Sequence, residues 1–381
     1  MTINLFVAGL VMRKSCSIAI VGAGVAGMAL AILAKQQGMA VTLFERHSQI
    51  SVMGAGVTLW PNAMWVLDKM GLSSMALRLG GQPLQLKQYD SQGQLLGELD
   101  LSAIADNSGY PCVTILRRDL AYLIAQRLEK LGIYPQFNRS VSVVELKELQ
   151  QEYDLVVGAD GRMASCTRAL LFPNSRPLRY HHFINIIGIS DCLGGTMGHA
   201  IADYRAPHMR FGVVPAKPGL CYWAAGWQTP MDRTRNESSW LDDMQQRFAH
   251  WAKPVQHVLS HYHPQSLKRI FVHDVEPLPY WHQDNLVIIG DAAHGPLPTS
   301  GQGACQALED AWHLARLLSG PGILEHKLRA FYQLRIHKTT TIQTIGRQIA
   351  EQIFHSEKFA LSLSSASPSQ LKDFWMQGLE V

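Results

Sequence analysis

The most constraining feature of the sequence is a short apolar run that breaks into glycines and then continues with helical spacing. Residues 17–21 read SIAIV, and the following GAGVAGMALAILAKQQG extends to Gly38. The apolar run predicts a parallel strand buried on both faces, and the Ala- and Leu-rich run predicts a helix that ends at Gly38. The next segment, AVTLFER, predicts a second strand that ends at Glu45. Together these segments predict a βαβ unit at the start of the chain.

The glycines of this unit have the spacing of a dinucleotide-binding turn. Gly22, Gly24 and Gly27 stand between the predicted strand and helix. The first glycine allows a tight turn, the second lets a pyrophosphate approach the backbone, and the third lets the helix pack closely on the strand. Glu45 follows at the distance where a carboxylate accepts hydrogen bonds from an adenosine ribose. The alternative is a glycine-rich turn without a ligand, but the βαβ context favours a dinucleotide.

A second strand end indicates which dinucleotide is bound. Residues 285–291 read NLVIIGD and lead into AAHGPLPTSGQG. A flavin dinucleotide extends past the pyrophosphate to ribityl hydroxyls, which need a second acidic residue at another strand end. Asp291 suits that role, and the loop behind it is rich in Gly and Pro and could turn backbone amides toward a flavin ring. The sequence therefore predicts FAD as the bound cofactor.

Composition bounds the remaining possibilities. A chain of 381 residues with 47% hydrophobic composition predicts two domains, or alternatively one large domain with an insertion. A net charge of +4 without long Lys/Arg runs argues against nucleic acid as a partner. The six cysteines form no C-x-x-C pair, so we expect no disulfide framework, no metal site and a cytoplasmic location. The apolar opening is too short to span a membrane, and we expect Met12-Arg13-Lys14 to be the natural start.

The rest of the chain continues the alternation of strands and helices. We expect a helix at 117–132, a strand and turn at 153–161, and helices after 303. Between them, 175–277 contains short β-like runs with turn signals, which predict an inserted and largely antiparallel domain. The stretch LSLSSASPSQ, from residue 361, predicts a surface linker.

Four motifs together carry a resemblance to a known family. They are the glycine turn with Glu45, GAGVTLWPNA at 54–63, GADG at 158–161, and GDAAHGPLPTSGQGACQALEDA at 290–311. With them, the chain from residue 16 to about residue 318 resembles the class A flavoprotein monooxygenases, the aromatic hydroxylases with the para-hydroxybenzoate hydroxylase fold. The resemblance implies that NADH or NADPH reduces FAD. It further implies that oxygen forms a flavin C4a-hydroperoxide, and that one oxygen atom passes to a small planar aromatic or heteroaromatic substrate.

The resemblance also implies the fold and its division. We expect an α/β fold with a Rossmann-like FAD-binding domain, an inserted, mostly antiparallel β-sheet substrate domain, and C-terminal helices. The protein would be a monomer or homodimer. The expected FAD-binding segments are 1–82, 108–174 and 278–381, and the expected substrate-binding segments are 83–107 and 175–277.

Site residues follow from the same likeness. Arg117 matches the arginine that opens a helix and contacts FAD, and Asp160 would contribute to FAD and nicotinamide-nucleotide binding, with a helix cap as its alternative role. Asp291 would bind the ribityl chain, and the 298–303 loop would lie along the flavin ring. Ser165 and Arg168 come one residue later than the family's spacing, which leaves the role of Arg168 open. The residues expected to bind the cofactor are Gly22, Gly24, Gly27, Glu45, Arg46, Gly56, Arg117, Asp160, Gly161, Gly290, Asp291, Pro298, Gly301, Gln302 and Gly303.

The substrate pocket is predicted from strand alternation in the inserted domain. Arg210 and Gly212 share one face of a strand, and Tyr222 and Ala224 share one face of the next. The spacing of Arg210 and Tyr222 around Pro215 is similar to that of bacterial FAD-dependent urate hydroxylases. Arg210 would pair with an anionic substrate and Tyr222 would donate a hydrogen bond to it. The alternative is that Arg210 lies on a solvent face and Tyr222 is core.

Other polar and aromatic residues are expected to be structural. His181, His199 and His208 could activate a phenol, but single histidines in such a domain are more often structural. His294 would support the flavin loop, and Trp223 and Trp227 would face away from Tyr222. Two alternative functions stay open. One is oxidation of a bulkier natural product or antibiotic of the tetracycline kind, and the other is a flavin-binding protein without catalysis.

Overall fold

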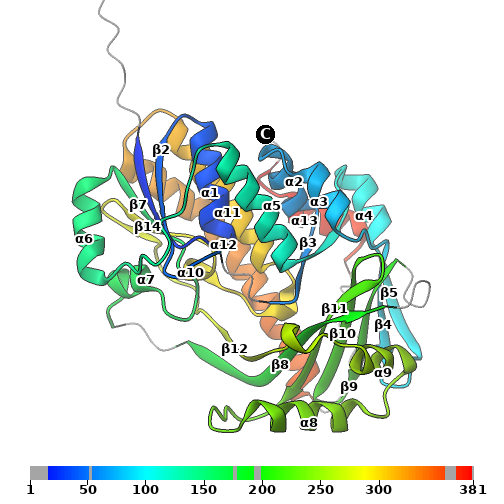
Figure 1. Cartoon of the computed structure of the whole chain (residues 1–381). Helices are drawn as coiled ribbons and strands as arrows, with labels where there is room; N and C mark the ends of the chain where they lie inside the picture. Colours follow the sequence, from blue (N-terminus) through cyan, green and yellow to red (C-terminus); the bar gives the residue numbers. More distant parts are fainter. Residues whose placement is uncertain (1–15, 51–53, 175–177, 193–198, 357–365, 380–381) are drawn as a thin grey trace, which may run out of the picture.

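Two sheets form the framework of the chain (Figure 1). The computed structural model describes residues 16–50, 54–174, 178–192, 199–356 and 366–379. The five-stranded sheet has the order β13-β14-β7-β1-β2, and the seven-stranded sheet has the order β12-β8-β11-β10-β9-β4-β5. The predicted start at Met12 and the first half of the predicted linker, residues 361–365, lie outside the described residues, whereas the second half leads into helix α13 (Pro368–Met376).

The five-stranded sheet contains the predicted βαβ unit. Strand β1 (Ser17–Val21) is parallel to both β2 (Ala40–Phe44) and β7 (Leu155–Gly158), and helix α1 (Val25–Gln36) connects β1 to β2. Next to β7 lies β14 (Leu286–Ile288), also parallel. The predicted strands within 153–161 and 285–291 are therefore confirmed, and their carboxyl ends meet at one edge of the sheet. The short β13 (His282–Gln283) pairs antiparallel with β14 and is the outermost strand, at the end of the sheet opposite β2.

Helices cover this sheet and continue to the end of the chain. The predicted helix at 117–132 is α5 (Arg117–Lys130), and the predicted helices after residue 303 begin with α11 (Gly303–Ser319), which packs against α1. Helix α12 (Leu324–Ala350) has 27 residues, so it is about 40 Å long. It ends in a π-helical turn, η3 (Glu351–His355), where Phe354 stacks on Phe183 of the other sheet at 4.0 Å.

The seven-stranded sheet is antiparallel except where β4 pairs with β9. The largely antiparallel character predicted for 175–277 is thus confirmed. All strands of this sheet fall within the segments predicted to bind substrate. The strands are β4 (Gln85–Asp90), β5 (Leu95–Asp100), β8 (Arg179–Asp191), β9 (Ala200–Ala206), β10 (Met209–Lys217), β11 (Leu220–Gln228) and β12 (Lys268–Asp274).

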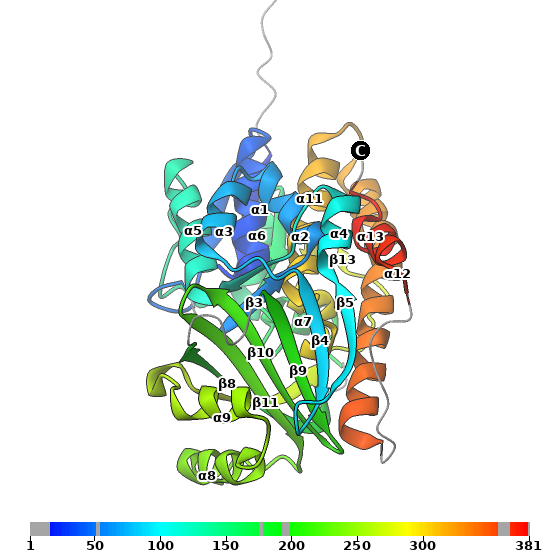
Figure 2. The ribbon, with the colours of Figure 1, turned by 90° about the vertical axis from the view of Figure 1, so that its right-hand side faces the viewer.

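One face of this sheet is covered by two helices that were not expected from the sequence (Figures 1 and 2). They are α8 (Glu237–Phe248) and α9 (Lys253–Ser260). Trp223 and Trp227 are buried in the apolar cluster below these helices, together with Phe211 and Trp240. The two tryptophans are therefore core residues, as predicted, and the opposite face of the sheet is the one turned toward the five-stranded sheet.

Smaller elements join the two sheets. Strands β3 (Gly56–Leu59) and β6 (Val113–Leu116) pair with each other, and helix α13 (Pro368–Met376) lies against α2 (Pro61–Lys69) and α4 (Leu101–Ser108) (Figure 2). Among the described residues, no helix is both long and apolar enough to cross a membrane. The remaining helical elements are α3 (Ser73–Leu79), α6 (Val143–Glu152), α7 (Cys166–Leu171), α10 (Asp291–His294), and the 3-10 turns η1 (Pro264–Ser266) and η2 (Pro298–Ser300).

Candidate active site

The glycine turn after β1 has the geometry that a phosphate site needs. Gly22 has φ +107°, and a Cβ there would lie 2.4 Å from the carbonyl oxygen of Ala159. A Cβ at Gly27 would lie 2.0 Å from the carbonyl oxygen of Gly22. At Gly24, by contrast, a Cβ would meet no heavy atom within 4 Å. Gly22 and Gly27 are therefore required by packing, whereas Gly24 leaves open space at the N-terminus of α1, which suits a pyrophosphate.

Glu45 lies beside this turn, directly after β2. Its Oε2 accepts a hydrogen bond from the amide of Ala23 at 2.9 Å, and its Oε1 lies 2.6 Å from His47 Nδ1. These contacts fix the carboxylate, and carboxylate oxygens can accept further hydrogen bonds, so the arrangement fits an adenosine ribose. The neighbouring Arg46 is exposed. His47 was missed from the sequence because no motif position singles it out.

Asp291 begins α10 at the carboxyl end of β14. Its side chain is 36% exposed, and Arg162 contacts Oδ2 through Nη2 at 3.0 Å and Nε at 3.1 Å. Desolvation opposes ionisation, but the charges of Arg162 and Arg117 keep the pKa of Asp291 below its usual value. The preceding Gly290 has φ +60°, and a Cβ there would lie 2.9 Å from the Cβ of Ala26 on α1. Asp291 is thus an accessible, ionised acceptor that fits ribityl hydroxyls.

Arg162 is a site residue that the sequence interpretation missed. Besides Asp291, its Nη1 donates to the carbonyl oxygens of His273 at 2.8 Å and Pro296 at 3.0 Å. It therefore connects the GADG turn, the loop after Asp291 and β12. The available signal was an arginine directly after the DG pair, at a position that the motif leaves unspecified.

Asp160 forms hydrogen bonds with residues at the start of α7. It accepts hydrogen bonds from the hydroxyls of Ser165 and Thr167, each at 2.7 Å, while Ser165 Oγ accepts from the amide of Arg168. Asp160 also accepts a hydrogen bond from the backbone amide of Thr167 at 3.1 Å, which is a capping contact of the kind given as its alternative role, although Ser165 occupies the N-cap position itself. The late position of Ser165 is accommodated, since it still reaches Asp160. Arg168 Nη1 donates to the carbonyl oxygen of Ala292 at 3.0 Å, so its role is to join α7 to α10. Beside Asp160, Gly161 has φ +81°.

Arg117 lies at the first position of α5, as predicted. Its side chain packs against Gly54, where a Cβ would lie 2.7 Å from Arg117 Cδ. Burial lowers the pKa of Arg117, and the nearby charge of Asp291 raises it. Residues far apart in the sequence, Arg117, Arg162 and Asp291, are therefore brought to one place at the edge of the five-stranded sheet.

The 298–303 loop is held in place by hydrogen bonds to Trp60 and to helix α12. The carbonyl oxygen of Gly301 accepts a hydrogen bond from Trp60 Nε1 at 2.9 Å, and the hydroxyl of Thr299 donates to the carbonyl oxygen of Gly346 on α12 at 2.6 Å. The side chain of Gln302 accepts from Asn62 Nδ2 at 3.0 Å and is buried. Because the Gln302 side chain is engaged in the interior, this loop can offer a ligand mainly backbone groups, including those of Pro298 and Gly303.

His294 supports this region through the buried carboxylate of Asp310. The distance from His294 Nε2 to Asp310 Oδ2 is 2.6 Å, and the same oxygen accepts from the amide of Gly290 at 2.8 Å. His294 is buried, which agrees with the supporting role expected for it. The buried carboxylate of Asp310 thus holds both Gly290, before α10, and His294, at its end.

The face of the seven-stranded sheet opposite α8 and α9 carries a charged cluster. Arg210 Nε lies 2.5 Å from Asp203 Oδ1, and Arg205 Nη2 lies 2.7 Å from Asp203 Oδ2. Asp203 is buried and the Arg210 side chain is 31% exposed. Desolvation opposes ionisation of Asp203, but Arg210 and Arg205 lower its pKa. Two guanidinium groups share one carboxylate, so the cluster has a net charge of +1. The sequence interpretation of Arg210 omitted Asp203 and Arg205.

Tyr222 is packed against the cofactor side of the molecule. Its hydroxyl lies 2.9 Å from Thr58 Oγ1 on β3, and a Cβ at Gly56 would lie 2.1 Å from Tyr222 Cδ1. Burial raises the pKa of Tyr222. This environment matches the core alternative given for Tyr222. It also gives Gly56 a packing role, because any side chain there would displace the Tyr222 ring.

Arg210 and Tyr222 do not meet directly. Tyr222 pairs with Val214 on β10, four residues beyond Arg210, so their backbones are about 14 Å apart along the strand. The guanidinium of Arg210 folds back toward Tyr222, however, since its Nη2 lies 3.6 Å from the position of a Cβ on Gly212. A substrate there would contact the guanidinium nitrogens of Arg210 and not its aliphatic carbons.

The three histidines considered as possible bases, His181, His199 and His208, have structural settings. His181 Nε2 lies 2.9 Å from the buried carboxylate of Asp274, and His208 Nδ1 lies 2.9 Å from the carbonyl oxygen of Phe354. His199 is exposed, and its carbonyl oxygen accepts from the amide of Leu84 at 2.7 Å. None of these contacts involves the Asp203 cluster.

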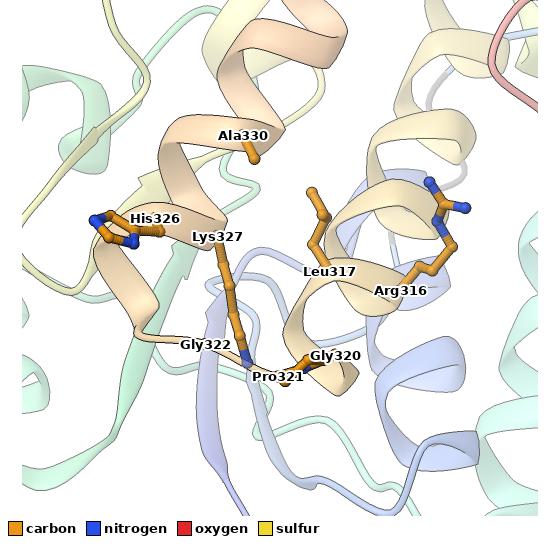
Figure 3. Close-up of a pocket in the computed structure, with 8 residues that line it drawn as sticks. All are labelled: Arg316, Leu317, Gly320, Pro321, Gly322, His326, Lys327 and Ala330. Carbon is orange, nitrogen blue, oxygen red and sulfur yellow. The ribbon is translucent and has the colours of Figure 1, made fainter.

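A cavity of about 390 Å³ lies at the turn between α11 and α12 (Figure 3). It is near the end of α11 opposite Gly303, so about 20 Å of helix separates it from the flavin loop. The amino group of Lys327 donates a hydrogen bond to the carbonyl oxygen of Leu318 at 2.9 Å. This cavity contains no predicted site residue. Its lining residues are Arg316, Leu317, Gly320, Pro321, Gly322, His326, Lys327 and Ala330.

Comparison with known proteins agrees with this geometry. The FAD binding domain family matches residues 15–321. The Aurachin C monooxygenase/isomerase of Stigmatella aurantiaca is 30% identical over 338 residues, covering 86% of this chain and 87% of that protein. The FAD-dependent urate hydroxylase of Klebsiella pneumoniae subsp. pneumoniae is 25% identical over 374 residues, covering 94% and 93%.

Solved structures show the same fold. The crystal structure of Klebsiella pneumoniae HpxO complexed with FAD and uric acid superimposes with a TM-score of 0.80 at 21% identity, covering 90% of each chain. The tetrameric form of 2-methyl-3-hydroxypyridine-5-carboxylic acid oxygenase gives 0.73, covering 92% of this chain and 95% of that one. The α/β fold with its FAD-binding part is thereby confirmed. The chain belongs to the FAD binding domain family and, within it, to the class A flavoprotein monooxygenases.

Proposed function

We propose that this monooxygenase uses NADH or NADPH and molecular oxygen to hydroxylate a small planar aromatic or heteroaromatic substrate that carries a negative charge. The observation that carries the charge assignment is the Asp203–Arg205–Arg210 cluster, which has a net charge of +1 and lies on the face of the seven-stranded sheet opposite α8 and α9, with the Arg210 side chain partly exposed. When bound, FAD supplies the electron transfer and oxygen chemistry. The residues of this chain bind and orient the reactants and exclude water.

FAD binding is proposed for the residues that meet at the edge of the five-stranded sheet. The turn around Gly24 would hold the pyrophosphate, Glu45 the adenosine ribose, and Asp291 the ribityl chain, with Arg117 close by. Support comes from the open space at Gly24 and from the partly exposed, ionised carboxylate of Asp291. The proposed set also keeps Gly22, Gly27, Arg46, Gly56, Asp160, Gly161, Gly290, Pro298, Gly301, Gln302 and Gly303, to which we add Arg162.

Substrate binding is proposed for Arg210, with Asp203 holding its guanidinium. A guanidinium has five donor hydrogens, so the groups of Arg210 that do not face Asp203 can still bind a carboxylate or an enolate oxygen. Tyr222 would close the other end of the pocket against β3. Relatives named FAD-dependent urate hydroxylase and 6-hydroxynicotinate 3-monooxygenase, at 25% and 28% identity, agree with a small heteroaromatic substrate. A cytoplasmic location and a monomeric or homodimeric state are also proposed.

The test is anaerobic stopped-flow reduction of the FAD-loaded protein by NADH and by NADPH. The panel would include urate, 6-hydroxynicotinate, hydroxybenzoates and tetracycline. We expect one small anionic compound to accelerate flavin bleaching by orders of magnitude and to be hydroxylated when oxygen is admitted. Stimulation by tetracycline alone would favour the bulky-substrate alternative, and FAD binding without any stimulation would favour a protein without catalysis.

A further inference from the structure

We propose that the C-terminal helix α13 positions the flavin loop, and that Trp375 is the residue through which it acts. The inference rests on the proposed placement of the flavin beside the 298–303 loop. Helix α13 (Pro368–Met376) begins well beyond the last motif of the family resemblance, which ends at residue 311, so no sequence motif connects it with the cofactor. In the fold it lies against α2 and α4 (Figure 2).

The first link is a pair of packed indoles whose planes are tilted by 39° to each other. The ring centroids of Trp375 and Trp60 are 4.6 Å apart, and both residues are 8% exposed. Trp60 precedes α2, and its Nε1 donates to the carbonyl oxygen of Gly301 at 2.9 Å. Gly301 has φ +64°, and a Cβ there would lie 3.2 Å from Trp60 Nε1. The indole of Trp60 therefore sits directly between α13 and the tightest turn of the flavin loop.

The second link is a buried amino group that holds the end of α13. Lys338 on α12 donates to the carbonyl oxygens of Trp375 at 2.6 Å and Gln377 at 3.3 Å. It also lies 2.9 Å from Glu309 Oε1. Lys338 is 4% exposed and Glu309 is fully buried, so these groups have no solvent to replace a lost partner.

The third link returns from Glu309 to the flavin loop. Glu309 Oε1 accepts from Asn62 Nδ2 at 2.6 Å, and the same amide group donates to Gln302 Oε1 at 3.0 Å. Arg335 contacts Glu309 Oε2 at 2.5 Å and Asp310 Oδ1 at 2.8 Å, so the two cations Lys338 and Arg335 face two carboxylates. The loop is thus connected to α13 twice, through Gly301 by way of Trp60 and through Gln302 by way of Glu309 and Lys338.

This arrangement makes α13 part of the cofactor site without contact to the cofactor itself. Packing of Trp375 against Trp60 holds the Trp60 indole in place, and this indole in turn fixes the Gly301 carbonyl. Because the peptide groups of the loop are the groups it can offer to a flavin, rotation of that carbonyl changes the flavin environment. Trp375 and Trp60 are accordingly positioning residues.

The experiment compares Trp375→Ala, Trp375→Phe, Trp60→Phe and the double variant Trp60→Phe/Trp375→Ala in the full chain. Met376→Ala is the matched control, since Met376 is buried in the same helix at 3% exposure. FAD dissociation constants and the visible circular dichroism of the bound flavin are measured without substrate. These readouts do not depend on hydroxylation, so failure of this inference is distinguishable from failure of the proposed function.

We expect Trp375→Ala to weaken FAD binding by roughly fivefold to tenfold and to change the visible circular dichroism of the flavin. Trp375→Phe should restore both, Met376→Ala should alter neither, and Trp60→Phe should reproduce the spectral change. In the double variant, Trp375→Ala should add little to Trp60→Phe, because both act through one contact. Equal loss of affinity in Trp375→Ala and Met376→Ala with an unchanged spectrum, or fully additive effects, would overturn the inference. If Trp375→Ala does not fold, an unchanged flavin spectrum in Trp60→Phe overturns it alone.

Discussion

The two sheets of this protein present their proposed ligand sites by different means. At the edge of the five-stranded sheet, the determining features are backbone conformations and strand ends: Gly22 with φ +107°, open space at Gly24, and carboxylates near the carboxyl ends of β2 and β14. On the seven-stranded sheet, they are side-chain pairings across strands, such as Asp203 with Arg210. The first kind leaves a local sequence pattern, and the second depends on strand register. Cofactor binding should therefore tolerate few changes, whereas substrate preference should change with single side chains.

The largest effect is expected at the interior support of the cofactor edge. Asp310→Asn removes the charge that faces Arg335 at 2.8 Å and His294 at 2.6 Å, all within a buried cluster. Loss of one partner of a buried ion pair costs about 3–5 kcal/mol of unfolding free energy. Urea denaturation at pH 7 measures this loss. A loss below about 1 kcal/mol would contradict the assigned role of the cluster.

The same residue gives a pH dependence. Despite desolvation, His294 and Arg335 lower the pKa of Asp310 from 3.8 to about 2. A carboxyl whose pKa is lowered by folding stabilises the protein above its unfolded pKa, and that stability is lost as pH falls through the folded pKa. The wild type should therefore lose stability from Asp310 between about pH 4 and pH 2. Asp310→Asn should show a shallower decline over that window, and parallel curves would contradict the assignment.

The next effect concerns the seven-stranded sheet, which carries the proposed substrate site. Arg210→Gln should lower kcat/KM for the anionic substrate by roughly a hundredfold, because a charge-assisted contact contributes about 1.5–3 kcal/mol. FAD affinity should stay within about twofold of the wild type, since Arg210 is on the other sheet. Asp203→Asn should instead favour substrates with one more negative charge, because it raises the net charge of the cluster from +1 to +2. Equal losses of FAD binding and kcat/KM would remove the distinction between the two regions.

A matched pair of glycine substitutions tests the backbone argument. Gly22→Ala should destabilise the protein by about 1–3 kcal/mol, because its Cβ would overlap the carbonyl oxygen of Ala159 at 2.4 Å. Gly24→Ala should leave the unfolding free energy within about 0.5 kcal/mol but weaken FAD binding, since the open space there is proposed for phosphate. Thermal unfolding and FAD titration separate the two effects. Similar destabilisation by both would show that the turn is only structural.

The smallest effect is expected where the two regions touch. Tyr222→Phe removes the contact with Thr58 Oγ1 and should cost about 1 kcal/mol of unfolding free energy. Thr58→Val should cost a similar amount, and the double variant should cost less than the sum of both. Additive costs would show that the hydroxyls do not depend on each other.

Prediction from sequence succeeded where the determinant is local. The βαβ unit, the strand before Asp291 and the position of Arg117 at the start of α5 follow from apolar runs and glycine spacing. Arg162 and Asp203 could not be found in that way, because their partners lie 129 and 7 residues away and the pairing depends on the fold. The helices α8 and α9 were missed for another reason. Their apolar residues face a sheet whose existence had to be known first.

The length of α12 has a consequence for how the molecule unfolds. The helix contacts the flavin loop at Gly346, where a Cβ would lie 3.3 Å from Ser300 Cβ, and the turn that ends it stacks Phe354 on Phe183 of the substrate sheet. Arg347 adds an ion pair to Asp274 of β12 at 2.6 Å. Neither sheet can therefore melt without exposing a surface of this helix. The chain should lose its structure in one cooperative transition, with no state in which the cofactor half survives alone.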